Sequence, residues 1–68
     1  MQHSVKEIGE KYQTLYEKRG INFNSSNFYQ FALNNQNTYS LIKTFNNDFL
    51  VSTWYVDNLI ADYRKTLN

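Results

Sequence analysis

The residues of this chain that could perform acid–base chemistry are six carboxylic acids and one histidine. Paired carboxylates catalyse reactions when they converge in a pocket and have well-separated pKa values. His3 lies close to the N-terminus, where chain ends fray. We expect surface and capping roles for these groups, and no enzymatic activity, because the acids are spread along helix faces that we predict to be solvated. The six acids are Glu7, Glu10, Glu17, Asp48, Asp57 and Asp62.

The sequence also lacks residues that commonly bind cofactors and metals. The 68-residue chain has no cysteine, which removes thiol nucleophiles, cysteine-based zinc sites and iron–sulfur clusters, and fits a reducing cytoplasm. Gly9 and Gly20 fall within and at the end of one predicted helix, so they do not form a phosphate-binding loop. No run approaches the roughly 20 apolar residues that cross a membrane. We expect a cytoplasmic protein with no cofactor, no metal, no membrane contact and no small-molecule substrate.

Basic residues could bind nucleic-acid phosphates, but seven Lys and Arg barely outnumber six Asp and Glu, for a net charge of +1. Four cations lie at the ends of the first and last predicted helices, where they also oppose the negative end of the helix dipole. If these ends meet, the cations could form a basic pole beside tyrosines that stack on bases. Weak nucleic-acid binding is therefore our alternative hypothesis. The four residues are Lys18, Arg19, Arg64 and Lys65.

Aromatic residues make up 18% of the sequence, which argues against disorder and suggests a protein-binding surface. Trp54 lies off the apolar stripe of the last predicted helix, so it is either an interface residue or folds back as core. Tyr16 is offset from the stripe of the first helix, and Tyr55 borders that of the last. Together with Phe23 these residues are our candidate interface. We expect a non-catalytic interaction module that binds another protein or a second copy of itself as a homodimer.

The first helix is predicted by local signals over residues 5–19. Ser4 and Glu7 have the spacing of a capping box, in which the serine side chain satisfies an amide that has no helical partner. Gly20 is suited to the left-handed conformation that ends a helix. An apolar stripe follows the helical period at Val5, Ile8, Tyr12 and Leu15 and ends at Arg19.

Three further helices complete the predicted fold. One starts in residues 24–27 and ends by 34–35, another runs from residue 37 or 38 to 46–47, and the last is capped by Ser52 or Thr53. Residues 48–51 have strand-like character, but we predict an extended connection because no second strand-like run is evident. The expected fold is one all-α, four-helix domain over residues 1–68, with two longer outer helices around two short inner ones.

Two stretches of the sequence resemble the YozE family of small SAM-like helical proteins from low-G+C Gram-positive bacteria. Residues 27–33 (NFYQFAL) are similar to the aromatic opening of that family. Residues 39–41, 48–49, 56–59 and 62–63 are similar to its closing pattern. The resemblance covers residues 27–63, with a shortened middle and an extra N-terminal helix, and implies a SAM-like fold without an assigned activity. Together with the asparagine-rich composition, it suggests a low-G+C bacterium or one of its phages.

Overall fold

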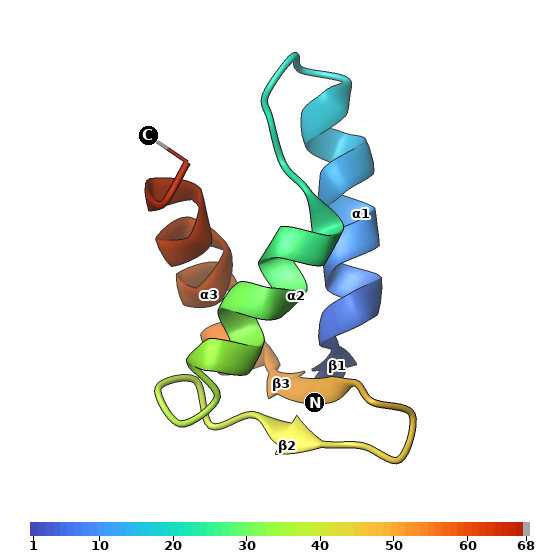
Figure 1. Cartoon of the computed structure of the whole chain (residues 1–68), viewed down its shortest axis with the longest axis vertical. Coiled ribbons are helices and arrows are strands. Elements are labelled where there is room, and N and C mark those ends of the chain that lie inside the picture. Colours follow the sequence, from blue (N-terminus) through green and yellow to red (C-terminus); the bar gives the residue numbers. More distant parts are fainter. Residues whose placement is uncertain (68) are drawn as a thin grey trace.

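A computed structural model describes residues 1–67 and shows three helices packed on a small antiparallel sheet (Figure 1). The all-α, four-helix, SAM-like prediction is therefore wrong, because the chain combines α and β structure. Strand β3 lies in the middle of the sheet, with β1 and β2 at its edges. The elements in chain order are β1 (Gln2–Ser4), α1 (Val5–Glu17), α2 (Ser25–Asn34), β2 (Ile42–Lys43), β3 (Phe49–Ser52) and α3 (Thr53–Lys65).

Helix α1 begins where the sequence predicts and ends two residues earlier. The Ser4 hydroxyl accepts a hydrogen bond from the Glu7 N–H at 3.1 Å. At the other end Gly20 has a φ of +72°, and the Ile21 N–H donates to the Tyr16 carbonyl at 2.9 Å. This i to i+5 bond over a left-handed glycine is a Schellman motif, which satisfies a carbonyl at the end of the helix.

The starts of α2 and α3 also follow from their local sequence. The side chain of Asn24 accepts the Asn27 N–H at 2.9 Å, and the Ser52 hydroxyl accepts the Trp54 N–H at 3.2 Å. Both are N-caps, which satisfy amides that have no partner within the helix. The sequence therefore predicts these two boundaries for the physical reason that operates in the structure.

The helix expected near residues 37–47 does not form, and β2 lies there instead. Ser40 and Asn47 both have a φ of +53°, a left-handed conformation that interrupts a right-handed helix. Asn47 ends a three-residue hairpin loop, in which the Thr44 N–H donates to the Asp48 carbonyl at 2.9 Å. The asparagine pair that we interpreted as a helix end is therefore a hairpin turn.

Residues 49–52 form the central strand β3, so the prediction of an unpaired extended connection is wrong as well. Its first partner is β1 at the start of the chain, with His3 opposite Val51, and its second is β2, with Ile42 opposite Leu50. Neither partner is recognisable locally, because two or three residues are too few to show the alternation of a strand. Phe49 and Val51 point into the core, and Leu50 and Ser52 are half-buried on the other side.

Asp48 joins the sheet to the start of α1. Its side chain is 9% exposed and accepts hydrogen bonds from the Ser4 hydroxyl, from the Lys6 N–H at 3.1 Å and from the Phe49 N–H at 2.7 Å. One carboxylate thus satisfies amides of the first turn of α1 and of the start of β3. A negative charge at this position also favours the positive end of the helix dipole.

The core between the helices and the sheet is built largely from aromatic rings. Phe23, Phe28 and Tyr63 pack with ring centroids 5.0–5.4 Å apart, and Tyr63 meets both phenylalanines edge-on. Gly9 allows α1 and α2 to approach, since a Cβ there would lie 3.2 Å from the Phe28 ring. Within residues 1–67, every buried side-chain nitrogen or oxygen has a hydrogen-bond partner.

We predict that Asp48→Ala lowers the free energy of unfolding by about 2–3 kcal/mol, because it leaves buried donors unsatisfied. Asp48→Asn should cost roughly half as much, since the amide keeps one acceptor oxygen. Urea unfolding followed by far-UV circular dichroism measures both changes. Glu10→Ala, which removes an exposed carboxylate from α1, is the control and should change stability by less than about 0.5 kcal/mol. Equal effects of Asp48→Ala and Glu10→Ala would contradict the proposed role of Asp48.

Candidate functional site

Trp54 lies in the first turn of α3, and its side chain is 81% exposed. Its backbone is held firmly: the Trp54 N–H bonds to Ser52, and the preceding Thr53 N–H donates to the Met1 carbonyl at 3.0 Å. His3 Nε2 also lies 2.7 Å from the Thr53 hydroxyl. Of the two alternatives for Trp54, the structure shows the surface position, with a large aromatic side chain in solvent on a well-anchored backbone.

The other predicted interface residues differ from Trp54 in their exposure to solvent. Phe23 is 3% exposed and packs in the core against Phe28 and Tyr63, so it is unavailable to a partner and leaves the candidate interface. The link between α1 and α2 packs this side chain into the core instead. Tyr16 is half-buried and stacks on Phe23 with a centroid distance of 5.4 Å. Tyr55 is half-buried against the core.

Trp54 and Tyr16 lie at opposite ends of the molecule. Trp54 is close to β1, since Thr53 bonds to Met1 and contacts His3. Tyr16 lies in the last turn of α1, roughly 16 Å beyond the start of that helix at 1.5 Å per residue. The predicted interface around Trp54, Tyr55 and Tyr16 is therefore not one continuous patch.

Sequence reasoning missed a second exposed aromatic residue, Phe45. It lies in the β2–β3 hairpin loop with its side chain fully exposed, and Ile42 of the preceding strand is 51% exposed. The loop is tethered to α2 because the Tyr29 hydroxyl donates to the Asn47 carbonyl at 2.5 Å. The signal that could have identified this residue is the asparagine pair after it, which is typical of a tight turn.

The outer edge of the sheet at β2 is a poor template for a partner strand. Only Ile42 and Lys43 belong to β2, and a short edge strand that carries a lysine discourages the addition of another strand. Contacts made by this end of the molecule would therefore depend on side chains, of which Trp54 is a large exposed example.

The four cations of the alternative hypothesis do gather at one end of the molecule. Helices α1 and α3 both start beside the sheet and run toward the opposite end of the molecule (Figure 1). The Arg64 guanidinium lies 4.6 Å from the centroid of the Tyr16 ring, which connects the two helix ends. Lys18 and Arg19 follow directly after α1, and Lys65 ends α3.

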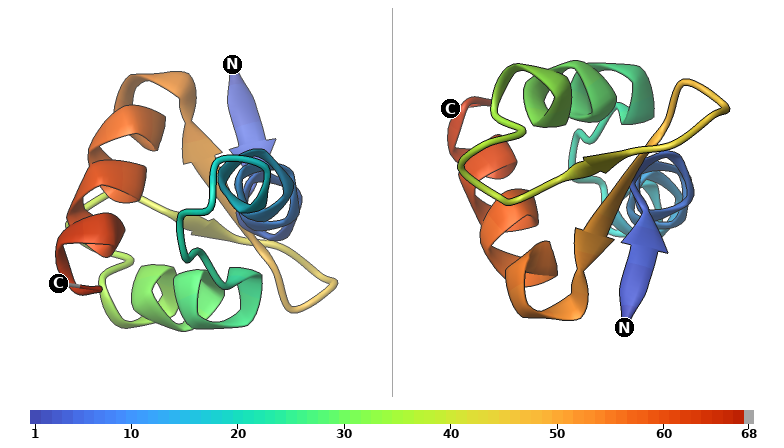
Figure 2. Two further views of the ribbon diagram at one scale, coloured as in Figure 1. Left: turned by 90° about the horizontal axis from the view of Figure 1, so that it is seen from above. Right: turned by 90° about the horizontal axis from the view of Figure 1, so that it is seen from below.

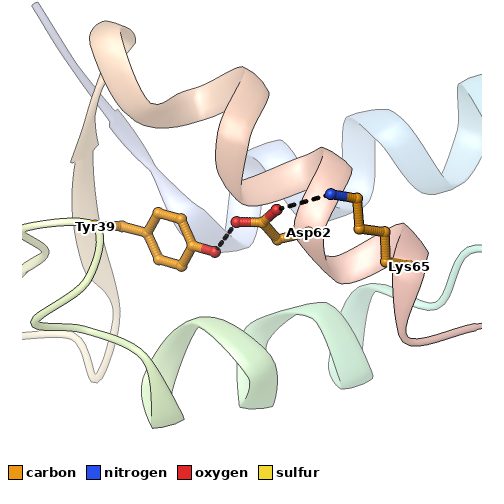
Figure 3. Close-up of polar contacts among 3 residues, drawn as sticks. All are labelled: Tyr39, Asp62 and Lys65. Atoms are coloured by element: carbon orange, nitrogen blue, oxygen red, sulfur yellow. Dashed lines mark hydrogen bonds and ion pairs between the residues drawn. The ribbon is translucent and has the colours of Figure 1, made fainter.

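The positive charge of this basic pole (Lys18, Arg19, Arg64 and Lys65) is partly cancelled. Lys65 Nζ lies 3.9 Å from an Asp62 oxygen (Figure 3). Glu17, the last residue of α1, adds a second carboxylate at this end. Two helix C-termini meet there too, each equivalent to roughly half a negative charge. The positive charge that remains is small for a surface that would bind nucleic acid mainly through its phosphates.

Asp62 also accepts a hydrogen bond from the Tyr39 hydroxyl, which ties the segment before β2 to α3 (Figure 3). Burial raises the pKa of Tyr39 to about 12, and the hydrogen bond to Asp62 and the negative charge of that residue act in the same direction. This contact holds together segments of the fold, and through Asp62 it adjoins Lys65 of the basic pole.

Within residues 1–67, no group of three or more His, Asp or Glu side chains is arranged to hold a metal ion. In the same part of the chain, no helix has both the length and the apolar character needed to span a bilayer. Comparison with known proteins finds no match: no family model fits the sequence, and neither a curated protein nor a solved structure is significantly similar. The resemblance to the YozE family stays a prediction.

We predict that the free energy of unfolding falls as the pH rises from about 10 through about 12, because folded Tyr39 holds its proton more tightly than the unfolded chain, whose tyrosine pKa is 10.0. Tyr39→Phe should reduce this fall and, at neutral pH, cost about 1 kcal/mol of stability. Urea unfolding across this pH range tests both expectations. Tyr55→Phe is the control, and a pH dependence unchanged by Tyr39→Phe would contradict the assignment.

We predict that the fluorescence of Trp54, the one tryptophan of the chain, resembles that of a free indole in water. Its emission maximum and its quenching by acrylamide should match those of N-acetyl-tryptophanamide closely, because the side chain is 81% exposed. A blue-shifted, poorly quenched emission in dilute protein would show that Trp54 is covered.

Proposed function

We propose that this chain is a non-catalytic protein-interaction module that binds its partner through the sheet end of the molecule, with Trp54 as the main anchor. The observation that carries the proposal is the 81% exposure of Trp54 on a backbone fixed by hydrogen bonds from the Trp54 and Thr53 amides. Tryptophan is among the residues that most often dominate the energy of protein interfaces. Fixing its backbone before binding reduces the entropy lost on association.

The surroundings of Trp54 support the same proposal. Met1, which is 95% exposed, is bonded through its carbonyl to Thr53, the residue before the tryptophan, and adds a flexible apolar side chain at this end of the molecule. Methionine adapts to irregular surfaces, so the two side chains together suit an apolar pocket in a partner. The remaining large aromatic side chains mostly pack in the core, which leaves few competing anchors.

Nucleic-acid binding through the basic pole is the second candidate. It is supported by the way α1 and α3 bring Lys18, Arg19, Arg64 and Lys65 to one end of the molecule. It is weakened by the nearby acids and helix C-termini and by the net charge of +1. We therefore rank it below protein binding.

We further propose a cytoplasmic location in a low-G+C bacterium or one of its phages or mobile elements. The absence of cysteine supports a reducing compartment, and the abundance of asparagine suits an A+T-rich genome. A small aromatic module of this kind could act as a regulator or inhibitor of a host protein.

We predict that Trp54→Ala lowers the amount of partner recovered with the tagged chain from its own cells by about tenfold or more, the effect expected of an interface hot spot. Quantitative mass spectrometry of the recovered proteins measures the change. Phe45→Ala is the matched control, because it removes a fully exposed aromatic side chain that precedes the other end of β3. It should leave recovery of the partner unchanged.

The paired variant Lys18→Glu/Arg64→Glu separates the two candidate functions. Under the protein-binding proposal it leaves recovery of the partner intact, and the chain shifts neither DNA nor RNA in a gel. If Trp54→Ala has no effect while the paired variant abolishes a salt-sensitive nucleic-acid shift, the module binds nucleic acid and our proposal is wrong.

A further inference from the structure

A depression of about 300 Å³ lies between the N-terminal halves of α1 and α3, and β1 contributes to its wall. Both helices pack against α2, and Figure 2 shows α2 across one side of the space between them. The volume is at the lower limit of pockets that hold a whole small ligand. The depression therefore suits a single side chain that another molecule supplies.

Part of the lining is apolar. Ile8 is 8% exposed and belongs to the core, and Tyr12 and Val56 are half-buried against the core. Apolar surface of this kind covers the aliphatic stem of a long side chain, while the polar head of that side chain stays in water or binds at the rim.

Two hydroxyl groups in the lining are already engaged within the fold. The Ser4 hydroxyl donates to the Asp48 carboxylate, and the Thr53 hydroxyl lies 2.7 Å from His3 Nε2. The strongest polar groups that remain for a ligand are therefore the charged side chains of the lining.

Three charged side chains line the depression: Glu7, Lys11 and Asp57. Within residues 1–67, none of the three takes part in an ion pair. Lys11 Nζ lies 5.9 Å from the centroid of the Tyr12 ring. Two carboxylates against one ammonium leave the lining with a net charge of −1 at pH 7, with the histidine neutral, and this charge favours a cation.

The depression adjoins Trp54, the anchor of the proposed interface. Thr53, which lines the depression, directly precedes Trp54. Asp57 follows Trp54 by three residues, a spacing that makes two side chains neighbours on the surface of a helix. A guanidinium group binds well to both kinds of neighbour, because it stacks on an indole ring and forms charged hydrogen bonds with carboxylates.

We propose that the partner bound through Trp54 inserts an arginine side chain into this depression. The aliphatic part of the arginine lies over Ile8 and Val56, and its guanidinium binds Glu7 and Asp57. Lysine fits less well, because its ammonium is more strongly hydrated and does not bind carboxylates in a planar, bidentate way. The inference rests on the proposed function and names the chemistry of the partner, a protein surface that carries an arginine beside an apolar pocket for Trp54.

Titration of the isotope-labelled chain with N-acetyl-arginine amide, followed by NMR, tests the arginine site without the partner. The backbone amide signals of His3, Glu7 and Asp57 should shift in a saturable way at millimolar concentration. N-acetyl-citrulline amide is the control, since it replaces the guanidinium by an uncharged urea group of nearly the same shape, and it should cause little shift. Equal shifts with the two compounds, or none with either, would overturn the proposal.

Charge variants assign the site to its residues. Glu7→Gln/Asp57→Asn should weaken binding of the arginine amide by about threefold to tenfold, the effect of two exposed charge pairs. Glu10→Gln/Glu17→Gln makes the same change in net charge at exposed positions outside the lining and should bind like the wild type. Lys11→Gln should tighten binding, because it removes the one cation that opposes the guanidinium. Equal weakening by the two acid-to-amide variants would show a non-specific charge effect and overturn the assignment.

Recovery of the partner with the tagged chain separates this inference from the proposed function. Glu7→Gln/Asp57→Asn should lower the recovery at low salt, and the difference from the wild type should narrow at high salt, where exposed charges are screened. If Trp54→Ala abolishes recovery while the double variant matches the wild type at low salt, the arginine site is wrong and the proposed function stands. If Trp54→Ala has no effect, the proposed function fails and this inference fails with it.

Discussion

The carboxylate of Asp48 is the contact on which the arrangement of this molecule depends. It accepts hydrogen bonds from the start of α1 and from the start of β3, which are 42 or more residues apart in the sequence. Because the carboxylate is nearly buried, water could not easily replace its oxygens as acceptors for these donors. The bond network therefore ties the N-terminal end of α1 to the sheet at one defined point.

The connections between the sheet and the helices set the direction of α1 and α3. Helix α3 begins directly after β3, and β1 leads directly into α1, so both helices start at the same end of the molecule. Their C-termini and the cations that accompany them consequently meet at the other end. The position of Trp54 beside the sheet is a consequence of this topology.

The aromatic surplus has a structural explanation. Tyrosine rings pack in or against the core, while their hydroxyls reach polar groups in neighbouring segments. Tyr29 binds the carbonyl of Asn47, and Tyr63 binds the carbonyl of Asn24 at 3.2 Å. In a domain too small for a deep aliphatic core, each such side chain buries apolar area and also fixes a loop. Trp54 and Phe45 take no part in this packing and are exposed, and Trp54 is the one that we propose as the anchor for a partner.

Short-range signals in the sequence determined the starts of all three helices, because a cap needs only residues that are two or three positions apart. Ser4, Asn24 and Ser52 each act on an amide within that distance. The basic residues of the far end were also identified from the sequence, as was the alternative that Trp54 is a surface residue. Local sequence patterns could not show that Phe23 packs in the core or that Trp54 and Tyr16 lie far apart, because both facts depend on tertiary packing. Only the tertiary structure decided that residues 2–4, 42–43 and 49–52 form a sheet, because their pairing spans up to 50 residues and each segment is too short to show a strand pattern by itself.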